Sequence, residues 1–230
     1  MTTATTVLIV DDEPMVRAGL RAILSTEDGI EVVGEAGDGA EAVGLVRRHR
    51  PDVVLMDVRM PVVDGIAATR LLTGAESPPA VVVVTTFEND DYVYDALLAG
   101  ARGFLLKRSP AEEIVAAVRT AATADALVFP GRLRALVESR AGSVVTPPVP
   151  GLDRLTAREG EVLRGMARGW SNAEIAAELF LGVETVKTHV RAVLTKMGAR
   201  DRTQAVIGAY EAGFVTPGSS SEPGEGGTGR

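Results

Sequence analysis

The stretch Val53-Val54-Leu55-Met56-Asp57-Val58-Arg59-Met60-Pro61 decides the fold of this chain. Its first four residues are apolar and two of them are β-branched, which predicts a strand that is buried on both faces. The apolar run ends at Asp57, and Pro61 is unsuited to a central strand. A carboxylate at the carboxyl end of a buried parallel strand lies where open α/β sheets form their ligand crevice. Taken alone, an Asp at this place more often simply opens the next loop.

Three further apolar runs also end in polar residues. These ends are Asp11-Asp12-Glu13 after Val7–Val10, Thr85-Thr86 after Val81–Val84, and Lys107 after Gly103–Leu106. If the strands are parallel, these side chains converge at one edge of the sheet, where clustered carboxylates repel one another unless a cation holds them. Oxygen ligands without nearby His or Cys favour a hard ion such as Mg²⁺, which leaves room for a phosphoryl group.

Residues 5–124 resemble the receiver domain of two-component response regulators. The resemblance implies that Asp57 accepts a phosphoryl group from a sensor histidine kinase. It also implies a Mg²⁺ site that consists of Asp11, Asp12, Asp57 and Arg59. Arg59 contributes its backbone carbonyl to this site. A carboxylate can act as a nucleophile and form an aspartyl phosphate.

The same resemblance assigns Thr85 and Lys107 to the phosphoryl oxygens and makes Phe104 an aromatic that moves with the switch. Lys and Mg²⁺ both neutralise charge on a transferred phosphoryl group. A phosphatase of the haloacid dehalogenase type also uses a strand-end Asp with Mg²⁺, but it requires a second Asp where this chain has Arg59. A constitutive DNA-binding protein with a degenerate receiver is the nearer alternative, although every expected receiver position is filled.

Short apolar runs alternate with amphipathic stretches through residues 5–124, as they do in βαβ units. The segment 31–35 is expected to be an edge strand, Asp38 to cap the second helix, and Ser109 to open the cap of the last one. Helices are expected at 14–26, 39–49, 64–72, 90–99 and 110–124. Five strands and five helices predict an α/β domain of the flavodoxin-like, doubly wound (βα)5 type.

Residues 125–150 are expected to form a linker that contains a short helix at 132–140. Its last ten residues hold three prolines, one glycine and no charge, which is typical of a semi-extended linker. The tail at 217–230 has five glycines, three serines and no large apolar residue, so it is expected to be disordered.

Residues 151–216 have a helical pattern throughout and predict an all-α, four-helix domain. Thr156 and Glu159 form a capping box, Ser171 or Asn172 caps a short helix up to 180, and Leu181-Gly182 supplies a tight turn. A longer helix at 183–197 and a last one at 202–211 follow. The buried face of the longer helix is expected to contain Val183, Val186, Val190, Val193, Leu194 and Met197. The spacing fits a helix-turn-helix and an ordinary four-helix subdomain equally well.

Three segments resemble the LuxR-type DNA-binding domain, namely Leu155–Glu159, Ser171–Ala176 and Glu184–Val190. Together with the receiver, they make the chain resemble a NarL/FixJ-type response regulator, which implies that helix 183–197 enters the major groove of DNA. Lys and Arg pair with guanine acceptors, and the residues expected at base edges are Lys187, Thr188 and Arg191. The residues expected to position the domain on phosphates are Ser171, Asn172, Thr185 and Thr203.

Length and composition agree with two cytosolic domains. The chain has 230 residues and a net charge of −7, and it lacks cysteine, an apolar run long enough to span a membrane, and a signal peptide pattern. Residues 1–150 carry a charge of −7, which argues against nucleic-acid binding by the first domain. Residues 151–216 carry +1 and are permissive for DNA.

These features predict a phosphorylation-switched transcription factor and not an enzyme. Phosphorylation of Asp57 is expected to draw in Thr85, repack Phe104 and expose a face of the receiver that dimerises. Dimerisation on paired half-sites would raise the DNA affinity of a domain this small. The expected partners are a sensor histidine kinase, double-stranded promoter DNA, a second copy on activation and RNA polymerase at the promoter, with no membrane.

Overall fold

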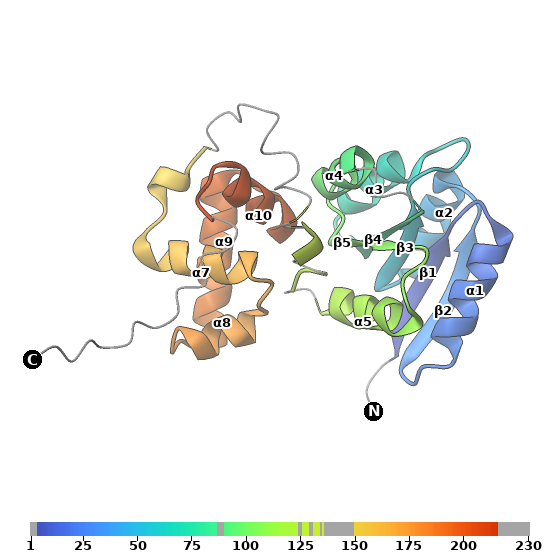
Figure 1. Cartoon of the computed structure of the whole chain (residues 1–230), viewed down its shortest axis with the longest axis horizontal. Coiled ribbons are helices and arrows are strands. Elements are labelled where there is room, and N and C mark those ends of the chain that lie inside the picture. The colour runs from blue at the N-terminus through green and yellow to red at the C-terminus, as the bar shows by residue number, and fades with distance from the viewer. Residues whose placement is uncertain are drawn as a thin grey trace, which may run out of the picture.

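A five-stranded parallel sheet with helices on both faces lies beside a helical unit (Figure 1). The computed structural model describes residues 4–86, 90–123, 126–128, 131–133, 135 and 150–215. The strands are β1 (Thr5–Val10), β2 (Ile30–Ala36), β3 (Val53–Asp57), β4 (Ala80–Thr85) and β5 (Gly103–Leu106). Their order is β2-β1-β3-β4-β5, which confirms the doubly wound sheet and the edge position of β2.

Five helices accompany these strands: α1 (Pro14–Ser25), α2 (Gly39–His49), α3 (Gly65–Thr73), α4 (Asp90–Leu98) and α5 (Ala111–Ala122). Helices α1 and α5 pack on one face of the sheet, and α2 and α3 pack on the other, each pair over its own apolar cluster. Asp38 caps α2 as predicted. The predicted role of Ser109 is wrong, because Pro110 holds the N-cap position of α5 and the Ser109 amide closes a turn onto the Leu106 carbonyl at 2.8 Å.

The strand register explains why distant polar residues meet at one edge. Val10 pairs with Met56, so the next residues of β1 and β3, Asp11 and Asp57, are neighbours. On the other side of β3, Asp57 pairs with Val84, one residue before Thr85. Parallel strands end at the same side of a sheet. The carboxyl edge therefore collects the polar ends of four strands.

The helical unit consists of η1 (Leu152–Arg154), α7 (Ala157–Ala167), α8 (Asn172–Glu178), α9 (Val183–Met197) and α10 (Arg202–Glu211). Capping boxes open α7 and α8, at Thr156 and at Ser171, and the bounds of α9 and α10 are the predicted ones. One expectation about α9 is wrong. Val183 is 39% exposed, because it is the first residue of the helix and projects beyond the helices that cover the later valines.

The sheet domain and the helical unit are in contact through α4 and α10. The side chains of Arg200 and Gln204 each donate a hydrogen bond to the Leu98 carbonyl at the end of α4, both at 2.9 Å. Tyr94 of α4 donates to the Glu211 carboxylate of α10. One apolar cluster contains residues from both parts of the chain.

Three predictions, two about the connecting segment and one about the tail, are left without a structural account. The predicted helix at 132–140 and the linker at 141–150 fall almost wholly outside the described residues, and the tail at 217–230 falls outside them altogether. Within the described part of the chain, no helix combines the length and apolar character needed to cross a bilayer.

Candidate functional site

Three carboxylates meet at the carboxyl edge of the sheet. Asp11, Asp12 and Asp57 each place an oxygen within 4.8 Å of the others. Asp11 and Asp57 are 1% and 5% exposed, whereas Asp12 is exposed at the mouth of the pocket. Two buried carboxylates side by side are unfavourable in their charged forms unless a positive group compensates them.

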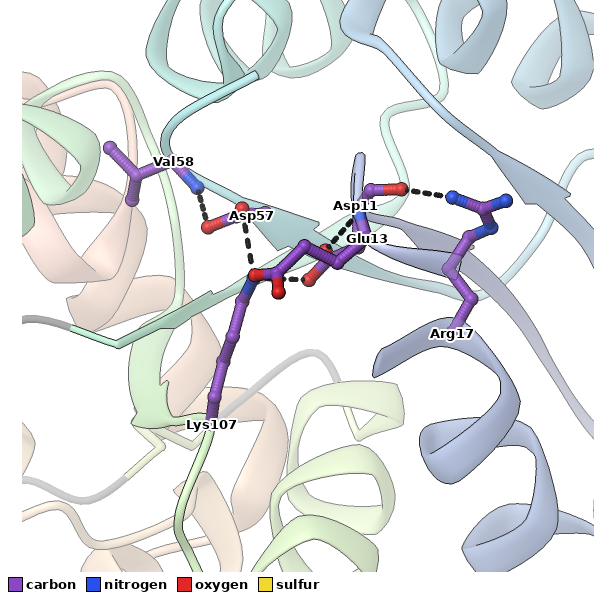
Figure 2. A network of polar contacts seen from close by, with 6 residues as sticks. All are labelled: Asp11, Glu13, Arg17, Asp57, Val58 and Lys107. Atoms are coloured by element: carbon purple, nitrogen blue, oxygen red, sulfur yellow. Dashed lines mark hydrogen bonds and ion pairs between the residues drawn. The ribbon is translucent and has the colours of Figure 1, made fainter. Parts of the chain in front are cut away.

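The compensating group is the ammonium of Lys107, whose side chain is 8% exposed. Its Nζ lies 2.8 Å from Oδ2 of Asp11 and 3.0 Å from Oδ2 of Asp57, and it also reaches Oε1 of Glu13 at 3.0 Å (Figure 2). Burial alone would lower the pKa of Lys107, but its contacts with these three carboxylates outweigh burial and raise the pKa. Lys107 is therefore a fixed cation in the pocket.

Asp57 is held in place by both of its oxygens. Oδ1 accepts a hydrogen bond from the Val58 amide at 2.7 Å, and Oδ2 contacts Lys107 (Figure 2). Burial raises the pKa of Asp57 above its ordinary value, while the contact with Lys107 acts in the opposite direction. The side chain is thus oriented and electrostatically supported, as a carboxylate nucleophile must be.

Two residues at this site were not found from the sequence. Glu13 was noted only as one of three acidic residues after β1, yet it contacts Lys107 and its amide donates to Oδ1 of Asp11 at 2.9 Å. Arg17, one turn into α1, donates to the backbone carbonyl of Asp11 at 2.6 Å (Figure 2). No local pattern marks Arg17, because its role depends on how α1 packs beside the loop.

The other candidate residues of the receiver lie around this pocket. Thr85 is 4% exposed at the end of β4, and its carbonyl accepts a hydrogen bond from the Lys107 amide at 2.8 Å. Arg59 follows β3, and its guanidinium lies 5.9 Å from the ring centroid of Tyr92. Phe104 is half-buried on β5 and packs against the apolar cluster that both parts of the chain share.

The donor set of the pocket fits a hard divalent cation. It consists of carboxylate oxygens, and Mg²⁺ takes oxygen ligands and keeps several waters. Oδ2 of Asp11 is buried and has no hydrogen bond of good geometry among the described residues, and it lies 2.8 Å from the Lys107 ammonium. A buried, charged oxygen in this position suits a cation, and exposed Asp12 leaves the pocket open for one to enter.

The second candidate site is the outer face of α9. Lys187, Thr188 and Arg191 are all exposed there, on the side opposite buried Val186 and Val193. The Lys187 ammonium pairs with Glu184 at 2.7 Å, an exposed ion pair that costs little to break. The described part of the receiver does not cover these three side chains.

The four residues expected at phosphates divide into two groups. Ser171 and Thr185 are half-buried and exposed, respectively, near the starts of α8 and α9. Asn172 and Thr203 are only 6% and 2% exposed, and Oδ1 of Asn172 accepts a hydrogen bond from Arg202 at 3.3 Å. A phosphate contact by Asn172 or Thr203 would therefore require these side chains to be uncovered first.

Two protein families match the two parts of the chain. Residues 7–119 match the response regulator receiver domain, and residues 153–209 match the bacterial regulatory proteins of the luxR family. These ranges contain the carboxylate pocket and the exposed face of α9, respectively.

Relatives align with nearly the whole chain. It is 43% identical over 204 residues to the transcriptional regulatory protein LiaR of Bacillus subtilis (strain 168), covering 89% of this chain and 96% of LiaR. It is 38% identical over 212 residues to the response regulator protein VraR of Staphylococcus aureus (strain NCTC 8325 / PS 47), covering 91% of this chain and 98% of VraR. The solved structure of the response regulator ChrA, from a heme-sensing two-component system, covers 92% of this chain and 99% of ChrA at 34% identity and a TM-score of 0.52. The chain therefore belongs to the two-component response regulators of the NarL/FixJ type, transcriptional regulators that join a receiver domain to a LuxR-type helix-turn-helix domain.

Proposed function

We propose that Asp57 accepts a phosphoryl group from a sensor histidine kinase and that the modified chain regulates transcription by binding promoter DNA through α9. The observation that carries this proposal is the contact of the Asp57 carboxylate with Lys107, beside Asp11. It combines an oriented nucleophile with a fixed cation at the open edge of the sheet. The chain acts in this proposal as a regulator and not as an enzyme with a separate substrate.

The chemistry follows from the position of each group. An Asp57 oxygen attacks the phosphorus of the kinase's phosphohistidine, so that an O–P bond forms while the P–N bond breaks and its electron pair returns to the imidazole. Lys107 and the Thr85 hydroxyl then bind phosphoryl oxygens. Asp11, Asp12, Asp57 and the Arg59 carbonyl would hold Mg²⁺, which when bound neutralises charge on the transferred group.

The interdomain contact suggests how phosphorylation reaches the DNA-binding domain. A phosphoryl group on Asp57 draws Lys107 and Thr85 toward it, and Phe104 of β5 packs against the apolar cluster shared with α10. Repacking of Phe104 therefore disturbs α4, whose Leu98 carbonyl holds Arg200 and Gln204. We propose that the receiver restrains α10 while leaving the α9 face open, and that its release permits dimerisation on promoter DNA in the cytoplasm.

Phosphate incorporation tests the role of Asp57. The full chain, incubated with Mg²⁺ and radiolabelled acetyl phosphate, should retain label, and Asp57→Asn should retain none. Asp28→Asn, an exposed change remote from the pocket, should be labelled like the wild type. Persistent labelling of Asp57→Asn would refute the assignment.

Sedimentation tests the switch to a dimer. Addition of beryllofluoride should convert the wild type from monomer to dimer. DNA binding by a chain that stays monomeric and unmodified would favour the constitutive alternative.

Binding to DNA selected from a random pool by the activated chain tests the face of α9. Lys187→Ala should weaken binding to a selected site about tenfold, because a side chain that reads a base contributes on the order of 1–3 kcal/mol of discrimination. Binding to unrelated DNA should change less. Thermal unfolding should be unaffected, since Lys187 is exposed. Unchanged affinity for the selected site would remove Lys187 from the residues that face bases.

A further inference from the structure

Arg17 connects the carboxylate pocket to the edge strand β2. Its Nη1 donates a hydrogen bond to the Asp11 carbonyl at 2.6 Å (Figure 2), and its Nε donates to Oε2 of Glu35 at 3.2 Å. The Arg17 side chain is 18% exposed, so both contacts are partly shielded from water. Glu35 lies on β2, where it pairs with Ile9 of β1. The guanidinium therefore joins the end of β1 to the neighbouring strand.

The Asp11 carbonyl belongs to the peptide unit that joins Asp11 to Asp12. A peptide unit is planar, so holding its orientation restrains one backbone dihedral angle of each residue and thereby the direction of both side chains. The Asp11 amide is already held, because it donates to the Ala36 carbonyl at 3.1 Å. Arg17 holds the following peptide unit, which carries Asp12 at the exposed mouth of the pocket. The contact therefore limits how far Asp12 can turn away from Asp11.

Electrostatic repulsion makes this restraint necessary. Asp11, Asp12 and Asp57 place oxygens within 4.8 Å of one another, and like charges favour separation. Lys107 pairs with the two buried carboxylates, whereas Asp12 is exposed, so repulsion drives it outward into water. A cation site whose ligands are held together before the ion arrives binds more tightly, because the cost of ordering them is already met.

The charge of Arg17 is offset by Glu35. Hydrogen bonds from Arg21 and Arg17 lower the pKa of Glu35, so this carboxylate stays ionised at neutral pH. Arg21 donates to Oε1 of Glu35, the oxygen that Arg17 does not use. An unmatched guanidinium beside the pocket would repel a divalent cation. Arg17 paired with Glu35 supplies a geometric restraint at a smaller electrostatic cost.

We propose that Arg17 is a positioning residue of the phosphoryl-transfer site, which holds the peptide unit between Asp11 and Asp12 in the orientation that binds a divalent cation. The inference rests on the proposed function, because it concerns the same pocket. Glu35 anchors the guanidinium, so β2 contributes to the site although it lies on the far side of β1 from Asp57. An ion pair that only stabilised the fold would need Glu35 and not the Asp11 carbonyl.

Magnesium affinity, measured without phosphoryl transfer, tests this inference. The full chain is unfolded in urea at a series of MgCl₂ concentrations and constant ionic strength. An ion that binds only the folded chain stabilises it by mass action, so the rise of the unfolding midpoint above its value in EDTA gives the dissociation constant. Arg17→Met removes both contacts of the guanidinium. Arg21→Met is the matched control, because it takes an arginine from the same carboxylate and leaves the contact with the Asp11 carbonyl in place.

The expected result is a weaker site in one variant only. Arg17→Met should bind Mg²⁺ about tenfold more weakly, as loss of a group that orients metal ligands predicts. Arg21→Met should stay within about twofold of wild type, because Arg21 is exposed and its charge is screened by salt. Arg17→Lys, which keeps a cationic donor for the carbonyl, should recover most of the affinity. Loss of a positive charge alone would tighten Mg²⁺ binding, so the sign of the change separates geometry from charge.

Two results would overturn the proposal. One is a lower midpoint of Arg17→Met in EDTA with an unchanged dissociation constant, which a purely structural role predicts. The other is an equal loss of affinity in Arg21→Met. Arg17→Gln, which keeps a polar end but is too short to bridge both partners, should show the same loss and provides the measurement if Arg17→Met does not fold.

Labelling by acetyl phosphate separates this inference from the proposed function. Arg17→Met should need about tenfold more MgCl₂ for half-maximal labelling, while its rate at saturating MgCl₂ stays close to that of wild type. Labelling of the wild type together with an unchanged MgCl₂ requirement in Arg17→Met would refute the role of Arg17 alone. A wild type that is not labelled at any MgCl₂ concentration would refute the proposed function and this inference with it.

Discussion

Substitution of Lys107 by Met provides the sharpest test of the electrostatics of the receiver pocket. Met has a similar length and no charge, so Lys107→Met removes the ammonium from between Asp11 and Asp57 while largely keeping the packing of the stem. The side chains of these two carboxylates are 1% and 7% exposed, whereas Glu13 is 59% exposed and easily solvated. The variant therefore leaves two buried negative charges without their counter-ion.

The expected loss of stability follows from this burial. Removing one partner of a buried ion pair costs about 3–5 kcal/mol, and the open mouth of the pocket at Asp12 favours the lower end, about 3 kcal/mol. The free energy of unfolding of a domain of this size falls by about 1.5 kcal/mol for each molar of urea. A loss of about 3 kcal/mol should therefore lower the urea concentration at the unfolding midpoint by about 2 M. Arg119→Met is the matched control, because Arg119 and Glu27 are 55% and 36% exposed and their pair contributes about 0–1 kcal/mol.

Urea unfolding of the full chain in EDTA at pH 7.5 measures this effect. Circular dichroism follows the receiver and the helical unit together, whereas fluorescence of Trp170, the single tryptophan, follows the helical unit. Lys107→Met should strongly lower the urea midpoint measured by circular dichroism and should leave the midpoint measured by Trp170 fluorescence nearly unchanged. A midpoint within about 0.3 M of wild type, smaller than any loss of a buried partner predicts, would refute the proposed electrostatics.

Magnesium and pH provide two independent checks on the same variant. Added Mg²⁺ should stabilise Lys107→Met more than wild type, because no ammonium competes with the ion for the carboxylates. At a Mg²⁺ concentration of about 100 times the dissociation constant, binding adds about 2.7 kcal/mol to the free energy of unfolding.

The pH check uses Asp57. Burial already raises the pKa of Asp57, and loss of Lys107 should raise it further. A carboxyl with a raised folded-state pKa favours folding at low pH and loses that contribution as the pH rises through the pKa. The variant should therefore regain stability on mild acidification, and equal responses of both proteins would contradict this account.

Three further predictions concern other parts of the chain. In Gly65→Ala, the added Cβ would lie 1.8 Å from the last carbonyl oxygen of β3, so one of the two groups must move. The free energy of unfolding, measured in urea, should fall by about 2–4 kcal/mol, and labelling by acetyl phosphate should be poor. Normal labelling would show that this close approach does not hold the site in place. Glu159→Gln weakens the contact with Lys196 and should destabilise the helical unit by about 2 kcal/mol at pH 7. Since contacts led by Lys196 lower the pKa of Glu159, this difference should shrink as the pH falls through that pKa, and a difference independent of pH would refute the ionic contribution. Tyr94→Phe removes the hydrogen bond to Glu211. The affinity of the unphosphorylated chain for selected DNA, measured by fluorescence anisotropy, should rise about threefold. An unchanged affinity would argue against restraint of α10 by the receiver.

The receiver pocket was predictable because it depends on strand ends and little else. An apolar run that stops at a polar residue marks the end of a buried strand, and parallel pairing brings such ends to one edge. Asp11, Asp57, Thr85 and Lys107 therefore meet as the sequence pattern predicts. Arg17 escaped prediction because its contact with the Asp11 carbonyl depends on the packing of α1.

The packing between the two parts of the chain had no counterpart in the sequence pattern. The sequence pattern predicts that α4 and α10 are helices, but it does not show that their buried residues belong to one cluster. The hydrogen bonds from Arg200 and Gln204 to the Leu98 carbonyl join residues more than 100 positions apart. Such contacts follow from the path of the connecting segment, which local residue patterns do not determine.

The helix-turn-helix shows where sequence patterns become ambiguous even within one domain. A polar residue near the start of a helix suits a DNA phosphate and an internal partner equally well, and Asn172 holds Arg202 in this structure. Thr203 is buried in the same way, whereas Lys187 and Arg191 are exposed on α9. A substitution at a buried polar position changes folding stability and DNA affinity together, because its partner is left unsatisfied. Variants of the exposed pair therefore report on DNA recognition directly, and variants of the buried pair do so only after their effect on unfolding has been measured.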